Sequence, residues 1–146
     1  MSRDYGEFGG ALKTPGGEIN GNFCDFFEAV GKIYAVDSLS HLGLASTTIY
    51  SFDCDCKYHK IFSDENLGFK ARYATGERAY ILVSGSVSTR SGGEKLKSIL
   101  LEISENGIDA KTKFDCGFYF GINLIFKNGK MILSPVKAGV VFDLQT

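Results

Sequence analysis

The densest group of residues able to do chemistry lies at positions 53–59, which read Asp-Cys-Asp-Cys-Lys-Tyr-His. Cys54, Cys56 and His59 place two thiols and an imidazole close together, and zinc takes these ligand types in tetrahedral sites. One of the remaining cysteines or the other histidine would have to complete the site: Cys24, Cys116 or His41. The pattern therefore supports the hypothesis of a zinc-stabilised module.

The spacing of this group also has a plainer interpretation. Zinc motifs usually separate paired cysteines by two to four residues, whereas a single residue separates Cys54 from Cys56. In an extended strand both cysteines point to one side, but His59 points away unless the chain turns at Lys57. The alternative is that these cysteines are ordinary packed or surface thiols. Apart from zinc, we expect no cofactor.

Groups suited to catalysis are scattered. Asp53 and Asp55 would share a strand face, as an acid–base or cation-binding pair requires, but solvated strand faces show the same pattern. A cysteine could pair with His41 or His59 as a nucleophile, yet no local nucleophile signature surrounds any of the four cysteines. The sequence therefore favours a non-enzymatic protein.

The element best defined by the sequence lies near the carboxyl end. Residues 114–126 alternate in the period of a half-buried strand. The apolar set is Phe114, Cys116, Phe118, Phe120, Ile122, Leu124 and Phe126. Asn128-Gly129 follows, a pair suited to the two positive φ angles of a type I′ turn, and a second apolar run returns over 131–142. The sequence thus predicts a long antiparallel hairpin.

The turn fixes the register of this hairpin. The predicted opposing pairs are Phe126 with Met131, Leu124 with Leu133, and Ile122 with Pro135. Beyond Pro135 the apolar alternation changes phase, and one extra residue near Ser134-Pro135 would restore it. We therefore expect a β-bulge there, where a proline does least harm to the strand ladder.

The two faces of the 114–126 strand suggest two kinds of contact. Its phenylalanine stripe could line a cavity for an apolar ligand or form the plain interior of a sandwich. On the opposite face Gly117 and Gly121 flank Tyr119, which leaves shallow gaps where a helix, a sheet or a partner chain could approach. Gly117, Tyr119 and Gly121 are therefore the predicted interface residues.

Earlier segments predict further strands and two short helices. Strands are expected at 45–52, 57–62, 67–74 and 79–88, with a hairpin turn at 75–77. Helical spacing of Phe26, Val30 and Ile33 predicts a helix within 25–42. Residues 94–105 also fit a helix after a capping box, although they could instead return as a strand from a turn at 91–93 and bury Ile99, Leu101 and Ile103.

Length, charge and composition set the outer limits. A chain of 146 residues is the size of one domain, with a formal net charge of −1 and no run of more than two basic residues, so we expect no nucleic-acid partner. The amino terminus lacks a signal-peptide pattern and no apolar run reaches the length of a membrane span, so a cytoplasmic protein with free thiols is expected. Glycine-rich residues 1–22 are expected to form an arm or loops.

Together these patterns predict a mainly β fold, with α+β as the variant, in which residues 23–146 form a single domain. The expected architecture is an antiparallel β-sandwich or squashed barrel with one or two short helices. Its expected role is a non-enzymatic interaction or assembly module, which self-associates or binds a protein as a subunit of a larger particle or apparatus or as an inhibitory partner. The alternatives are a small apolar-ligand or lipid-binding β-barrel and the zinc-stabilised module.

Overall fold

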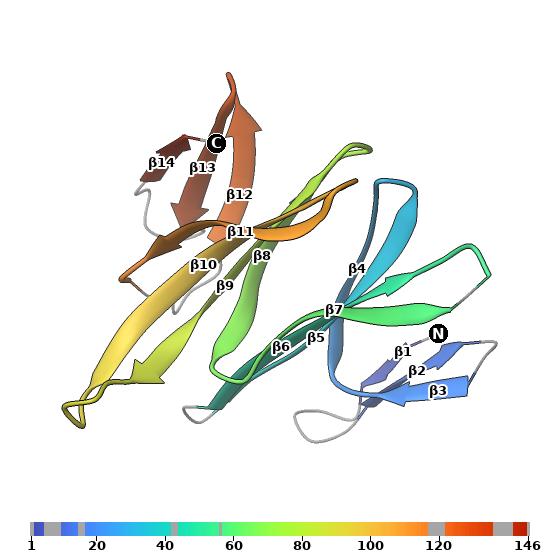
Figure 1. Ribbon diagram of the computed structural model, residues 1–146, viewed down its shortest axis with the longest axis horizontal. Helices are drawn as coiled ribbons and strands as arrows, with labels where there is room; N and C mark the ends of the chain where they lie inside the picture. Colours follow the sequence, from blue (N-terminus) through green and yellow to red (C-terminus); the bar gives the residue numbers. More distant parts are fainter. Residues whose placement is uncertain are drawn as a thin grey trace.

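The computed structural model describes residues 2–4, 10–14, 17–41, 44–55, 57–116, 122–135 and 142–145. All regular elements in these residues are strands, and they form four antiparallel sheets in which neighbours along the chain pair with each other (Figure 1). The strands are β1 (Ser2–Asp4), β2 (Gly10–Thr14) and β3 (Gly17–Asn20); β4 (Phe23–Ala29), β5 (Lys32–His41), β6 (Leu44–Phe52) and β7 (Tyr58–Asp64); β8 (Leu67–Ala74), β9 (Ala79–Ser88), β10 (Glu94–Ser104) and β11 (Gly107–Phe114); β12 (Ile122–Lys127), β13 (Lys130–Pro135) and β14 (Phe142–Gln145).

The two four-stranded sheets pack face to face as a sandwich, in the middle of the molecule in Figure 1. Their facing sides share the largest cluster of buried apolar side chains. It comprises Phe27, Ala29, Tyr34, Val36 and Ile49 from the β4–β7 sheet, and Leu67, Ala79, Ile81, Val83, Ile99, Leu101 and Ile103 from the β8–β11 sheet. Burial of this apolar surface is the main force holding the two sheets together.

The three-stranded sheets cover the outer sides of this sandwich. Leu124, Met131 and Leu133 of the β12–β14 sheet pack against Tyr80 and Leu82 of β9. On the other side, two apolar residues of the β1–β3 sheet pack against the outer side of the β4–β7 sheet: Leu12 and Ile19. The described strands thus form stacked open sheets and close no barrel, which selects the sandwich among the predicted architectures.

Strand β9 lies at the centre of this stack. Residues 79–84 are all buried, so both faces of the strand are covered. The sequence Ala-Tyr-Ile-Leu-Val at 79–83 shows why, because a strand buried on both sides carries a continuous apolar run. Gly85 follows in the same strand, and a Cβ there would clash with the carbonyl oxygen of Asn66, so only glycine permits this close approach.

Polar contacts also tie the β4–β7 sheet to β8. The Thr47 hydroxyl donates to the carbonyl oxygen of Leu67 at 2.7 Å, and the N–H of Phe69 donates to the Ser38 hydroxyl at 2.9 Å. Arg72 donates two hydrogen bonds to the carboxylate of Asp25, at 2.9 and 3.0 Å. These contacts fix the position of β8 relative to β4, β5 and β6 in a way that apolar packing alone does not.

The predicted carboxyl-terminal hairpin is confirmed where the structure describes it. β12 pairs with β13 in the expected register, with Phe126 opposite Met131, Leu124 opposite Leu133 and Ile122 opposite Pro135. Asn128 and Gly129 have φ angles of 53° and 75°, as a type I′ turn requires. The β8–β9 hairpin also has the predicted bounds, because 67–74 and 79–88 are its two strands.

Both predicted helices are wrong. The described part of the first segment, residues 25–41, lies in the β4–β5 hairpin, which turns at Val30-Gly31, and β10 covers 94–104 of the second segment. The strand alternative for the second segment is correct, since Ile99, Leu101 and Ile103 are buried. In each case pairing with a neighbouring strand overrides a local helical spacing.

The strand predicted at 114–126 is not continuous. β11 ends at Phe114, Asp115 and Cys116 lie outside any strand, and β12 begins at Ile122. The returning run at 131–142 is also divided, because β13 ends at Pro135 and Phe142 in β14 pairs back with Leu133. The register shows no shift up to Pro135, and the chain beyond it that would show the predicted bulge lies outside the described residues.

Residues 1–22 are predicted to form an arm or loops, but the described ones include regular strands. Their described part forms β1, β2 and β3, which pair as an antiparallel sheet. None of the described residues belongs to a helix that could cross a membrane.

Candidate functional site

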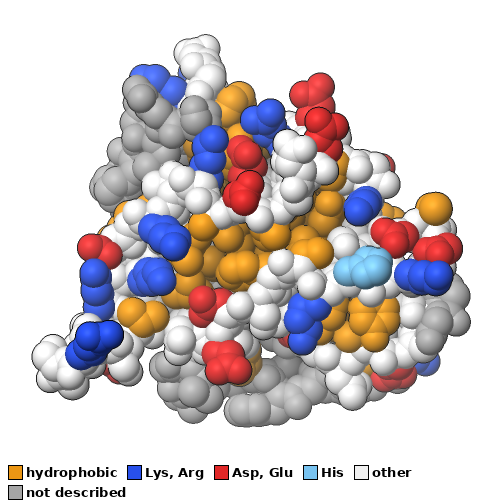
Figure 2. All heavy atoms as spheres, viewed as in Figure 1, with side chains coloured by type: hydrophobic (Ala, Val, Ile, Leu, Met, Phe, Trp, Pro, Cys, Tyr) orange, Lys and Arg blue, Asp and Glu red, His pale blue; other side chains and the backbone are white. Residues whose placement is uncertain are grey.

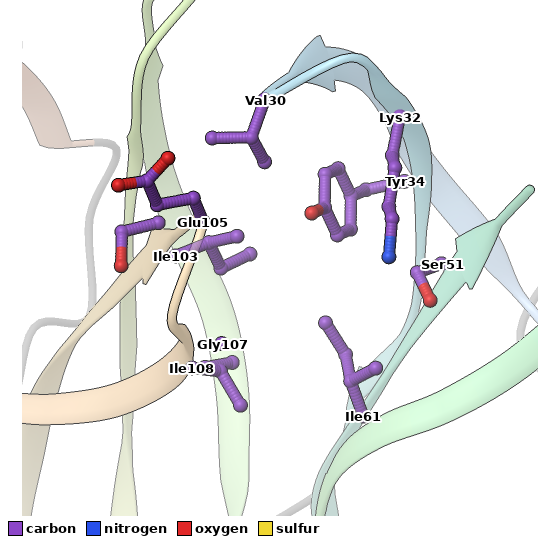
Figure 3. Close-up of a pocket in the computed structure, with 10 residues that line it drawn as sticks. Val30, Lys32, Tyr34, Ser51, Ile61, Ile103, Glu105, Gly107 and Ile108 are labelled. Carbon is purple, nitrogen blue, oxygen red and sulfur yellow. The ribbon is translucent and has the colours of Figure 1, made fainter.

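A cleft of about 410 Å³ opens between the two four-stranded sheets. One wall comes from the β4–β5 turn and from β5, β6 and β7, and the other from the end of β10 and the start of β11 (Figure 3). In Figure 2, hydrophobic side chains are visible across the middle of the molecule, and charged side chains surround them. The cleft is thus an apolar hollow with a charged rim, within the range of sizes typical of small-molecule sites.

Apolar side chains from both sheets line most of this cleft. Ile103 is 1% exposed on β10, and Ile108 on β11 is half-buried. Across the cleft, Val30 and Ile61 are partly buried and pack against the sandwich core. Figure 3 shows Ile61 and Ile108 pointing toward each other from opposite walls. An apolar group placed between them would lose contact with water on both sides.

Polar groups lie on both walls of the cleft: Ser104 and Glu105 on the β10–β11 side, and Lys32, Tyr34 and Ser51 on the β5–β6 side. Tyr34 is 3% exposed, and its hydroxyl points into the cleft in Figure 3. Ser51 is its cross-strand partner and is 4% exposed. A tyrosine with an ordinary pKa of 10.0 is already protonated at neutral pH, and burial raises the pKa of Tyr34 further. Both side chains can therefore donate a hydrogen bond to a bound group.

Val30 lies at the rim of the cleft, and its own backbone has an unusual conformation. Its φ angle is 47°, in the left-handed region that β-branched residues rarely adopt. Its N–H donates to the carbonyl oxygen of Gly76 at 3.0 Å, which fastens the β4–β5 turn to the β8–β9 turn. A residue kept in such a conformation costs about 1–3 kcal/mol and is often found at ligand sites.

Charged groups lie at the mouth of the cleft. Lys32 lines the cleft on the Tyr34 side, with its amine 3.9 Å from one oxygen of Asp53. The other oxygen of Asp53 lies 3.0 Å from Nε2 of His59. A carboxylate can orient an imidazole in this way for proton transfer, but among the described residues no nucleophile is hydrogen-bonded to His59.

Two of the three residues predicted to bind zinc, Cys54 and His59, are described in the structure, and neither lines the cleft. Cys54 is exposed in the β6–β7 turn, which the N–H of Asp53 closes by donating to the carbonyl oxygen of Lys57 at 2.8 Å. Cys56 lies outside the described residues, and the described part of the chain contains no cluster able to hold a metal ion. The zinc hypothesis therefore stays a prediction.

The proposed fourth zinc ligands are placed differently from one another. Cys24 lies on β4, with its sulfur 3.6 Å from the carbonyl oxygen of Val36. Cys116 follows β11, where burial and then the charge of Asp115 raise the pKa of its thiol. A raised pKa disfavours the thiolate form that zinc requires. The structure does not describe the side chain of His41.

The predicted interface residues cannot be placed, because Gly117, Tyr119 and Gly121 all lie outside the described residues. A different candidate interface lies on the outer side of the β4–β7 sheet, where large apolar side chains are exposed. We call it the aromatic face, and it consists of Phe23, Phe26, Ile33, Tyr50, Phe52 and Tyr58.

Neighbouring rings of the aromatic face contact one another in series. Phe23 lies 6.1 Å from Phe26 and 5.9 Å from Tyr50, between ring centroids. Tyr58 continues the series, 5.9 Å from Tyr50 and 6.0 Å from Phe52. The rings therefore form a continuous surface across three strands.

Part of this face is covered and part is open. Phe23 and Tyr50 are buried beneath the β1–β3 sheet. By contrast, Phe26 is 39% exposed, Ile33 is 55% exposed and Tyr58 is 48% exposed. Sequence reasoning missed the open part because the predicted helix at 25–42 placed Phe26 and Ile33 on a packed face. Gly31, between two apolar runs, was the available sign of a hairpin.

Comparison with models of protein families, with curated proteins and with solved structures gave no match to this chain.

Proposed function

We propose that the protein is a non-enzymatic interaction module and that the open part of its aromatic face binds a protein partner. The observation that carries this proposal is the exposure of Phe26, Ile33 and Tyr58 on one side of one sheet. Contiguous exposed apolar side chains mark interaction sites, and aromatic residues supply a large share of the binding energy at protein interfaces.

The covered half of the same face supports this proposal. Leu12 and Ile19 of the β1–β3 sheet pack on Phe23 and Tyr50, so this surface already takes a layer of protein. The open half continues that surface along the same strands, since Ile33 lies directly opposite Phe52 and Phe52 directly opposite Tyr58. A partner that extended the covering layer would bury these side chains in the same way.

Charges on the same side of the sheet would orient that partner. Glu28 lies opposite Ile33, and Lys60 lies opposite Tyr50, so an acidic and a basic side chain flank the rings. Both are exposed. Such rim charges contribute more to specificity and association rate than to affinity.

The test compares substitutions inside and outside the aromatic face. Ile33→Asp combined with Tyr58→Asp places two charges among the rings, whereas Ile125→Asp alters a residue of similar exposure, 43%, on β12. Sedimentation velocity reports self-association, and affinity capture from the native host followed by mass spectrometry reports another partner. We expect one of these to show an assembly that the double variant loses and Ile125→Asp keeps.

Two results would oppose the proposal. One is a monomer that captures no protein under native conditions. The other is an assembly that the double variant retains in full. Circular dichroism of both variants checks that the sheets remain folded. The two measurements also separate a self-assembling subunit from a module that binds a different protein.

A further inference from the structure

We propose that the cleft between the two four-stranded sheets binds a single-chain monocarboxylate, a ligand with an alkyl body and one carboxylate head. This ligand site lies on the inner side of the β4–β7 sheet, whereas the aromatic face lies on its outer side, so the two proposals stand independently. The lining of the cleft, the distribution of its donors and the charge at its mouth point to this ligand.

The alkyl body matches the apolar lining. Val30 and Ile61 on one wall face Ile103 and Ile108 on the other, so the space between them is apolar on both sides. Each methylene group that enters such a space leaves water, which favours binding. A volume of about 410 Å³ accommodates a small ligand but not a folded segment of another protein.

The carboxylate head matches the β5–β6 wall, where the polar groups are donors. Tyr34 carries its proton at neutral pH, and Ser51 lies beside it on the neighbouring strand. Lys32 adds a positive charge two residues before Tyr34, on the same side of β5. A ligand carboxylate accepts hydrogen bonds and carries the opposite charge, so it complements all three groups.

The charged groups near Lys32 do not prevent its amine from binding a ligand carboxylate. Its amine lies 3.9 Å from Asp53, which is longer than a hydrogen bond, and it keeps donors for a ligand. Glu105 stands on the opposite rim, and in Figure 3 its carboxylate points away from Tyr34. A second negative group on the ligand would approach Glu105, which favours a monocarboxylate over a dicarboxylate.

Isothermal titration calorimetry with sodium decanoate tests the site in the full-length protein. Decanol and decyltrimethylammonium carry the same alkyl chain with a neutral and a cationic head. We expect saturable binding of one decanoate per chain, at least tenfold tighter than either analogue, because the charge-assisted hydrogen bonds are lost without the carboxylate. Equal affinity for decanol would overturn the assignment of a carboxylate ligand.

Two substitutions assign the binding to this cleft. Lys32→Met keeps an apolar stem and removes the charge, so we expect decanoate to bind about tenfold more weakly. Tyr34→Phe removes only the hydroxyl, and we expect a loss of about three- to tenfold. Both changes preserve side-chain bulk, and thermal unfolding checks that each variant is folded.

Two further variants serve as matched controls. Lys57→Met removes an exposed lysine that pairs with Asp55 at 3.6 Å and does not line the cleft. Phe126→Ala alters a separate hollow of about 390 Å³, which Tyr73 and Tyr80 also line. Both should bind decanoate as tightly as the original chain. Absence of decanoate binding, or binding that neither Lys32→Met nor Tyr34→Phe weakens, would overturn the proposal.

Discussion

Two hairpin turns of this protein have similar positive φ angles but differ in the residue at the first position. Asn128-Gly129 joins β12 to β13 with φ angles of 53° and 75°, and Val30-Gly31 joins β4 to β5 with φ angles of 47° and 72°. Asparagine tolerates the first position, whereas a β-branched valine is strained there. The first turn is therefore favoured locally, and the second is held by its surroundings.

What holds the second turn is visible around Val30. Its N–H is bonded to Gly76, and its side chain packs on the sandwich core and lines the cleft. The strain is thus offset by packing and by a hydrogen bond to another hairpin. The β12–β13 turn is thus stabilised by its own residues, whereas the β4–β5 turn depends on tertiary contacts and shapes the cleft.

Core packing beneath the two hairpins gives the largest expected effects. The ring of Phe27 stacks on that of Tyr34, with 5.1 Å between centroids, and the Arg72 guanidinium lies over the Phe27 ring. Leu133, in β13 of the other hairpin, is fully buried. We expect Phe27→Ala to lower the free energy of unfolding by about 3–5 kcal/mol and Leu133→Ala by about 2–5 kcal/mol. Urea unfolding measures both. Losses below about 1 kcal/mol would show that a hairpin is not packed as described.

Asn128→Val tests the locally favoured turn. It places a β-branched residue at a positive φ angle with no tertiary contact to compensate, since the tip is exposed. We expect the free energy of unfolding to fall by about 1–2 kcal/mol. Asn128→Asp is the conservative control and should change stability by less than about 0.5 kcal/mol. An unchanged stability of Asn128→Val would mean that the turn is not type I′.

Val30→Asn is the reciprocal change in the strained turn. Relief of strain should exceed the loss of a half-buried side chain, so we expect the free energy of unfolding to rise by about 0.5–1 kcal/mol. The same variant should bind decanoate more weakly, because an apolar wall of the cleft becomes polar. Unfolding and calorimetry on one preparation measure both. A loss of stability would contradict the assignment of strain to Val30.

Alkaline pH gives the smallest contrast, since Tyr34 belongs to the β4–β5 hairpin and 122–135 contains no tyrosine. Burial raises the pKa of Tyr34 above 10.0 in the folded state, so the unfolded chain ionises first as pH rises. The stability contribution is therefore complete below about pH 10 and is lost above it. Urea unfolding between about pH 8 and pH 11 should show a steeper decline for the original chain than for Tyr34→Phe. Parallel declines would contradict this role.

Local patterns predicted the elements whose turn chemistry agrees with their strands. The β8–β9 and β12–β13 hairpins were predictable because alternation and turn residues indicate the same structure. The β4–β5 hairpin was not, since Val30 is a poor turn residue and helical spacing of Phe26, Val30 and Ile33 competed with it. Without that hairpin, neither the cleft nor the aromatic face could be predicted. Of the predicted zinc and interface residues, only Cys54 and His59 are described, and neither lines the cleft.

The sequence by itself determined that this chain forms antiparallel β-structure, because alternation with period two and glycine-containing turns act over a few residues. Tertiary structure alone decided that 94–105 is a strand, since Ile99 pairs with Val83 and the hydrogen bonds of that ladder come from a distant segment. It also decided which apolar side chains remain accessible. Tyr34 and Ile103 line one cleft although they lie in different sheets. The β1–β3 sheet covers Tyr50 but leaves Tyr58 exposed.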